Sequence, residues 1–161
     1  MSKVNQDSGI IYQLVSFVVE NEEYGIDILN VQEIIRMMEI SRVPNAPDFI
    51  EGVINLRGKI VPVVDLRKRF GRIPRKRDKE TRIIVVELGE KVVGFLVDQV
   101  QEVLRVPKSI IEPPPELAID IDARYITGVA KLDDRLLILL DLVRVLSAGE
   151  HQDLLAFEEV A

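Results

Sequence analysis

The side chains that most often carry enzyme chemistry are nearly absent from this sequence. The single histidine, His151, lies in the acidic segment 148–161, and there is no cysteine. Cysteine-ligated zinc and thiolate catalysis are therefore excluded, and a lone histidine in a tail gives no support to a Ser-His-Asp triad. The acidic pairs Asp133–Asp134 and Asp120 with Asp122 are typical of solvated turns. We predict a protein that is not an enzyme and has no cofactor and no metal site.

The charge distribution argues against nucleic acid and membranes as partners. The net charge is -6 at pH 7, which disfavours bulk attraction to nucleic acid. No uncharged run reaches the roughly 18 apolar residues of a membrane helix. The polar N-terminus also lacks a signal-peptide pattern. We therefore expect a cytoplasmic protein without direct membrane insertion.

A basic stretch at 67–82 stands out against this acidity. We interpret it as solvated chain, and the alternative is a contact for an acidic partner or for RNA. RNA-binding barrels usually add aromatic side chains that stack on bases, and only Phe70 is available here. A nucleic-acid-binding small barrel is thus the first alternative function. A hydrolase or transferase that uses carboxylates is the second.

Two sequence blocks recur in the same order along the chain. GIDILNVQEIIR at 25–36 is matched by GFLVDQVQEVLR at 94–105, and IEGVINLRGKIVPVVDL at 50–66 is matched by ITGVAKLDDRLLILLDL at 126–142. Apolar residues match by chance in strands, but Gly, Gln, Glu and Arg do not easily recur in order. We infer an internal duplication. The second copy is longer between its blocks, and the surplus falls in the proline-rich stretch 112–122.

The duplication divides the chain into two similar modules. We expect a flexible N-terminus at 1–10, a first module at 11–72, a basic connector at 73–80, a second module at 81–147 and an acidic tail or short helix at 148–161. Each module is near the lower size limit for independent stability. Two packed modules bury more surface, with exchange of a strand as one option, so one integrated domain is expected.

The local patterns predict mostly β structure. Runs of Val, Ile and Phe at 13–20 and 81–88, each followed by a polar turn and a return strand, predict two hairpins. Residues 28–36 predict a short helical turn that leads into a strand. Residues 52–66 predict a hairpin that turns at Arg57 and Gly58. About five short strands in each module suggest two tandem small barrels.

The candidate binding residues lie on predicted turns and exposed segments. Arg57 occupies a hairpin tip, which is solvent-facing, and arginine is favoured at interfaces. Glu33 belongs to the repeated VQE block, and Ile28 and Val31 are either core residues or part of a groove between the modules. The segment EPPPEL at 112–117 is stiffened by its prolines, so Leu117 is presented to a partner at little entropic cost.

Four motifs together resemble the CheW coupling-protein family of bacterial chemotaxis. They are EEYGIDILNVQEI at 22–34, FIEGVINLRGKIVPVVDLRKRFG at 49–71, VVGFLVDQVQEVL at 92–104 and YITGVAKLDDRLLILLDL at 125–142. The resemblance runs from about residue 10 to residue 147. It implies two five-stranded SH3-like β-barrels. The implied function is a non-enzymatic adaptor that couples the cytoplasmic tips of transmembrane chemoreceptors to the regulatory domain of the histidine kinase CheA.

The resemblance also implies where the partners bind. The receptor tip would occupy a groove between the barrels, and the kinase would bind a second face in a ring. The positions that match the family's receptor-binding residues are Val15, Ile28, Val31, Glu33, Gly52 and Arg57. The kinase or ring contact would be formed by Glu116 and Leu117 of the proline-rich loop. The adaptor would be cytoplasmic and recruited to receptor arrays at the membrane.

Overall fold

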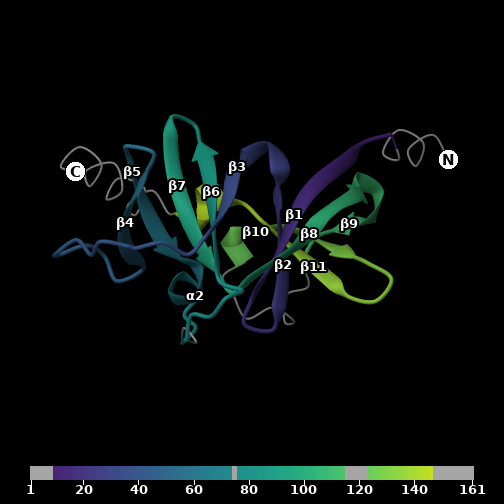
Figure 1. Cartoon of the computed structure of the whole chain (residues 1–161). Coiled ribbons are helices and arrows are strands. Elements are labelled where there is room, and N and C mark those ends of the chain that lie inside the picture. Colours follow the sequence, from purple (N-terminus) through teal and green to yellow (C-terminus); the bar gives the residue numbers. More distant parts are fainter. Residues whose placement is uncertain (1–8, 74–75, 115–122, 147–161) are drawn as a thin grey trace.

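The computed structural model describes residues 9–73, 76–114 and 123–146. These residues form two β-sheets joined by short helical turns (Figure 1). The prediction of a mostly β protein built from two small barrels is confirmed. The expected tail or helix at 148–161 lies outside the described residues, as does most of the expected N-terminal segment 1–10.

The first sheet has six strands in the order β8-β1-β2-β11-β10-β9. Its strands are β1 (Ile11–Val19), β2 (Glu22–Asp27), β8 (Gln99–Pro107), β9 (Ile111–Glu112), β10 (Ile126–Lys131) and β11 (Leu136–Leu140). The 3-10 turn η2 (Lys108–Ile110) joins β8 to β9. One bent segment therefore pairs with β1 at one edge and with β10 at the other. Its two-residue end, β9, is the sixth strand where five were predicted.

The second sheet has five strands in the order β3-β6-β7-β5-β4. Its strands are β3 (Val31–Arg36), β4 (Ile50–Leu56), β5 (Lys59–Asp65), β6 (Arg82–Leu88) and β7 (Lys91–Val97). The 3-10 turn η1 (Ile28–Asn30) precedes β3, as the sequence predicted. Beyond β3, an isolated bridge pairs Ser41 with Val53 of β4, so this segment also returns to the far edge of its own sheet.

Each sheet is built from strands of both sequence repeats. The β1–β2 hairpin pairs with β8 and β11, and the β6–β7 hairpin pairs with β3 and β5. In Figure 1 the purple strand β1 accordingly lies beside the green strand β8. The first hairpin of each repeat thus completes the sheet formed by the rest of the other repeat. The segments 11–72 and 81–147 do not each form a sheet of their own.

The strand register places the two repeats in equivalent positions. Leu139 of β11 lies opposite Gly25 of β2 in one parallel pair, and Val63 of β5 lies opposite Gly94 of β7 in the other. The repeated blocks align these same residues, Gly25 with Gly94 and Val63 with Leu139. Each repeat therefore plays the same part in its sheet, and any position in one repeat has a structural counterpart in the other.

One glycine in each repeat allows the returning segment to pass close to a strand. A Cβ atom on Gly52 would lie 2.2 Å from the backbone oxygen of Ser41, and the φ of Gly52 is +150°. A Cβ atom on its counterpart Gly128 would lie 2.7 Å from the side chain of Ile111. The recurring glycine is thus required where two chain segments approach closely, as glycine within strands often is.

A continuous apolar core joins the two sheets. Its largest cluster includes Phe17 and Tyr24 of the first sheet together with Phe95 of the second. Aromatic rings run through it, with centroids 5.8 Å apart for Phe17 and Tyr24, 5.2 Å for Tyr24 and Phe70, and 6.3 Å for Phe70 and Tyr125. These separations are those of favourable aromatic pairs. Because residues from both sheets build this cluster, the sheets stabilise one another.

Candidate protein-interaction surface

Arg57 lies at the tip of the β4–β5 hairpin in an unusual backbone conformation. Its φ is +52°, and that of Gly58 is +85°. Two consecutive residues with positive φ are typical of a tight hairpin turn, in which Asn or Gly is the usual first residue. The side chain of Asn55 accepts a hydrogen bond from the backbone N–H of Gly58 at 2.7 Å and supports the turn. An arginine is therefore not the residue that the turn itself favours.

The Arg57 side chain forms a bidentate ion pair with Glu33 of β3. Arg57 Nη1 donates to Glu33 Oε1 at 3.2 Å, and Nη2 donates to Oε2. The Arg57 side chain is 66% exposed, against 26% for Glu33. The hydrogen bond from Arg57 lowers the pKa of Glu33, and the carboxylate raises the pKa of Arg57. The ion pair thus orients the Arg57 guanidinium, and the exposed side chain can still contact a partner.

The second repeat carries a corresponding pair built from different residues. Glu102 of β8 is the counterpart of Glu33, and it accepts from Nη2 of Arg135 at 3.2 Å. The Nε of the same arginine donates to Glu23 of β2 at 2.6 Å. Each VQE glutamate is therefore held by an arginine from the neighbouring hairpin turn, although the arginine occupies a different position in each turn.

Ile28 and Val31 lie where the chain crosses from the first sheet to the second. Ile28 begins η1 and Val31 begins β3. Both side chains are partly buried and pack against the core cluster shared by the two sheets. Both are apolar residues with an accessible edge at the junction of the sheets. Their positions are compatible with a role in the core and with a role in a groove.

Val15 and Gly52 lie beneath the surface. Val15 is 1% exposed and belongs to the shared core, and Gly52 is buried against the backbone of Ser41. Among the predicted receptor-binding residues, Glu33 and Arg57 are in direct contact, and Ile28 lies next to Val31 at the sheet junction. Glu116 and Leu117 lie outside the described residues.

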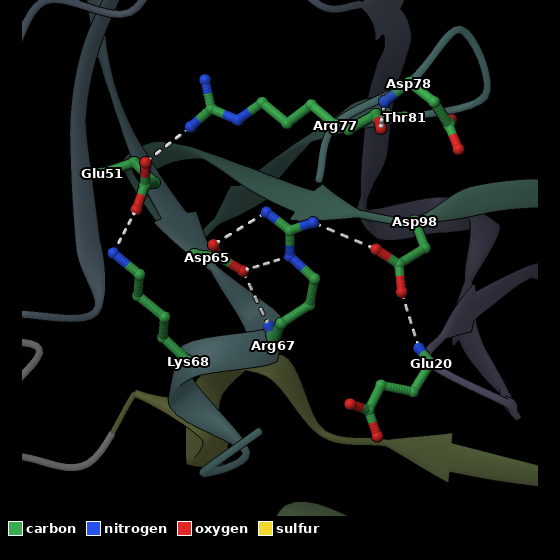
Figure 2. Close-up of polar contacts among 9 residues, drawn as sticks. All are labelled: Glu20, Glu51, Asp65, Arg67, Lys68, Arg77, Asp78, Thr81 and Asp98. Carbon is green, nitrogen blue, oxygen red and sulfur yellow. Dashed lines mark hydrogen bonds and ion pairs between the residues drawn. The ribbon is translucent and has the colours of Figure 1, made fainter. Parts of the chain in front are cut away.

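A buried charge network that the sequence interpretation missed connects the two sheets (Figure 2). Asp65 caps the N-terminus of the short helix α2 (Leu66–Arg69), and Arg67 lies in that helix. The Arg67 guanidinium donates to Asp65 at 2.9 Å and 3.0 Å and to Asp98 at 3.1 Å. Asp98 in turn accepts from the backbone N–H of Glu20 at 2.7 Å, at the β1–β2 turn. The network thus runs from the end of β5 to a hairpin of the other sheet.

The three charged side chains of this network are almost completely buried. Exposure is 2% for Arg67, 1% for Asp65 and 2% for Asp98. Burial opposes the charge of Arg67, but hydrogen bonds and attraction from Asp65 and Asp98 outweigh it, so the pKa of Arg67 is raised. A buried charge needs such partners. In the sequence this network is visible only as Asp-x-Arg at 65–67, where the basic stretch begins, so the interpretation of that stretch as solvated is wrong for Arg67.

Other cations of the basic stretch are also engaged. Glu51 of β4 is paired with Lys68 Nζ at 2.6 Å and with Arg77 Nη2 at 2.5 Å (Figure 2). Burial tends to raise the pKa of Glu51, but Lys68 and Arg77 lower it overall. Arg69 lies over the rings of Phe49 and Tyr125, 5.5 Å and 4.9 Å from their centroids. The stretch 67–82 is therefore not a uniformly solvated connector, because several of its cations hold the domain together.

Across residues 9–73, 76–114 and 123–146, no three acidic, histidine or cysteine side chains are grouped so as to hold a metal ion. The helices of these segments are also too short or too polar to cross a membrane.

Comparisons with known proteins agree with the two-sheet architecture. The chain matches the CheW-like domain over residues 13–150. It is 46% identical over 138 residues to the chemotaxis protein CheW of Klebsiella aerogenes, covering 86% of this chain and 83% of that protein. It is 36% identical over 141 residues to the chemotaxis protein CheW of Helicobacter pylori, covering 88% and 85%.

A solved structure shares both sequence and fold with this chain. The crystal structure of the scaffolding protein TtCheW from Thermoanaerobacter tengcongensis superimposes with a TM-score of 0.80 at 41% sequence identity. The match covers 88% of this chain and 91% of that one. Family match, curated relatives and fold therefore agree over nearly the whole length, and the chain belongs to the CheW-like domain family.

Proposed function

We propose that this chain is a cytoplasmic chemotaxis adaptor that couples receptor tips to the regulatory domain of the histidine kinase CheA. The observation that carries this proposal is its similarity, over 88% of its length, to a scaffolding protein of known structure. An adaptor needs surfaces for two partners and no reaction centre. The exposed, oriented arginine at the β4–β5 tip supplies one anchor of the kind found at interfaces.

The proposed receptor surface consists of the Arg57–Glu33 pair together with Ile28 and Val31. Glu33 orients the Arg57 guanidinium, so little side-chain entropy is lost when a partner carboxylate or carbonyl binds it. Ile28 and Val31 offer apolar edges at the sheet junction, suited to the apolar stripe of a receptor helix. Val15 belongs to the core cluster against which Ile28 and Val31 pack, and Gly52 lies in β4, the strand that leads to Arg57.

The proposed kinase surface involves Glu116 and Leu117. This assignment rests on the resemblance of the proline-rich loop to the family. The regulatory domain of the kinase would bind there while the receptor binds near Arg57, so that both partners are held at once. Signals would then pass as shifts between packing arrangements of the partners.

Capture experiments test the proposal with an internal control. Tagged protein is mixed at moderate salt with a receptor-tip fragment and with a CheA regulatory domain from the same genome. Arg57→Glu is compared with Lys79→Glu, which reverses a charge at another exposed position. Loss of an interface anchor is expected to reduce receptor capture by about tenfold or more. Lys79→Glu and kinase capture should be unaffected.

The outcomes separate the coupling role from the position of the receptor surface. If the wild-type protein captures neither partner, the adaptor proposal fails. If Arg57→Glu still captures the receptor fully, the receptor binds elsewhere. A melting temperature within about 3 °C of wild type for Arg57→Glu would show that the domain is intact.

A further inference from the structure

The repeat creates two equivalent places at the junction of the sheets, and they are occupied differently. In the first place, Asp65 at the end of β5 caps α2, and Arg67 fills the space toward Asp98. The backbone N–H of Glu20, which has a φ of +56°, completes this network. One arginine thus closes this side of the junction.

The second place retains part of this arrangement but lacks the arginine. Asp141 is the counterpart of Asp65 and caps the short helix α3 (Leu142–Val145) in the same way. Gly89, with a φ of +63°, is the counterpart of Glu20. However, Val143 stands where the first repeat has Arg67, and Leu29 stands where it has Asp98. Val143 is 55% exposed and Leu29 is 87% exposed, so neither closes the junction.

A cavity of about 710 Å³ occupies this second place. Its lining includes Leu88 and Gly89 of the β6–β7 hairpin together with Asp141 and Val143 at the start of α3. This volume lies in the range of ligand pockets, roughly 300–1,000 Å³. The cavity is separate from the Arg57–Glu33 pair, because neither residue lines it.

The lining favours a cation with an apolar stem. Its carboxylates are those of Asp27, Glu87 and Asp141, against one ammonium group from Lys108. Leu14 and Leu139 contribute buried apolar surface. Arg144 reaches Asp141 from outside the cavity at 3.4 Å, and its side chain is 64% exposed. Exposed pairs of this kind are weak and can be displaced.

We propose that this cavity binds an arginine side chain presented by a protein partner. The arginine would take the place that Arg67 takes in the other repeat, with its guanidinium toward Asp141 and its methylene stem against the leucines. Arginine suits this position because its planar donors pair with carboxylates while its stem packs on apolar surface. The inference goes beyond the adaptor proposal and does not depend on which receptor or kinase binds.

Peptide titrations followed by amide chemical shifts test this directly. The probe is acetyl-Leu-Arg-amide, and the matched control is acetyl-Leu-citrulline-amide, which has nearly the same shape without the charge. Saturable shifts at Gly25, Gly89 and Thr127, which line the cavity, are expected with the arginine probe. Binding of the citrulline peptide should be at least about fivefold weaker, as expected for loss of charge-assisted hydrogen bonds.

A second experiment fills the cavity from within. The double variant Leu29→Asp with Val143→Arg rebuilds the residues of the other repeat at two exposed positions, so it should remain folded. It should lose the response to the arginine probe. The neutral double variant Leu29→Asn with Val143→Gln, which adds no cation, should keep it.

Four results would overturn the assignment. One is equal binding of the arginine and citrulline peptides, and another is a stronger response to acetyl-Leu-Glu-amide. The third is an unchanged response in the folded Leu29→Asp, Val143→Arg variant. Absence of any saturable shift with the arginine probe would also reject it. None of these results bears on receptor or kinase capture, so the two proposals fail independently.

Discussion

Arg57 and Arg67 differ sharply in burial. Arg57 is 66% exposed and sits in a turn conformation that other residues adopt more easily. Arg67 is 2% exposed and bridges two carboxylates at the sheet junction. The Arg57 side chain is accessible to a partner, whereas the Arg67 side chain has almost no solvent-accessible surface. The sequence placed Arg57 at a hairpin tip and left Arg67 among the cations of the basic stretch, and only the structure shows that the first side chain is exposed and the second buried.

Replacing Arg67 should destabilise the domain strongly. Arg67→Met keeps much of the side-chain volume but deprives Asp65 and Asp98 of the guanidinium between them. Removing one partner of a buried ion pair typically costs about 3–5 kcal/mol. The free energy of unfolding, measured by urea denaturation, should fall by about this amount.

Arg77→Met is the matched control for this experiment. Arg77 also pairs with a carboxylate, but 41% of its side chain is exposed. Its replacement should cost about 1 kcal/mol or less. Equal losses for the two variants would mean that the Arg67 network contributes no more than a surface pair.

At the scale of elements, the recurring glycines mark where each bent segment returns to its sheet. Gly52 is required by the approach of Ser41, whereas Gly58 is required only by its backbone angle. The sequence suggested Gly52 as a binding residue because the family motif contains it. Its buried position indicates that it serves the packing of the Ser41 segment against β4.

Gly52→Ala should be much more destabilising than Gly58→Ala. Both positions have positive φ, but a Cβ atom at Gly58 meets no atom within 4 Å. Strain from φ alone costs about 1–3 kcal/mol in each variant. The clash with the Ser41 backbone adds to this at Gly52, so its thermal midpoint should fall further. Similar midpoints for the two variants would show that the Ser41 segment moves away without cost.

At the scale of the whole molecule, strand exchange makes the two repeats depend on each other. The first sheet pairs β1 with β8 and β2 with β11, and the second pairs β3 with β6 and β5 with β7. All four pairings join residues from different repeats. The shared apolar core is likewise built from residues of both repeats. Neither repeat retains a complete sheet when the other is removed.

Fragments 1–75 and 76–161 should therefore be unfolded alone and should fold when mixed. Circular dichroism and amide shift dispersion would report the β structure of each sample. An equimolar mixture should recover the spectrum of the intact chain, because the four strand pairings that join the repeats can form between the two fragments. A dispersed spectrum from either fragment alone would contradict this expectation.

The strands, the turns and the duplication were predictable from local sequence patterns. Alternating β-branched residues, polar turns and the glycine at the β4–β5 tip are local signals, so the hairpins and the η1–β3 transition at 28–36 were predictable. The motif pattern also identified the family, which the comparisons show. These features depend on neighbouring residues, and neighbouring residues are what a sequence displays.

The pairing of strands into sheets, the burial of charges and the position of the cavity became known from the folded chain. Arg67 and Asp98 are far apart in the chain and meet because β5 and β7 pair side by side. The counterpart place stays open because Val143 and Leu29 replace that arginine and that aspartate. Such features arise from long-range packing, in which the same local pattern is compatible with several partners, so the folded chain alone selects among them.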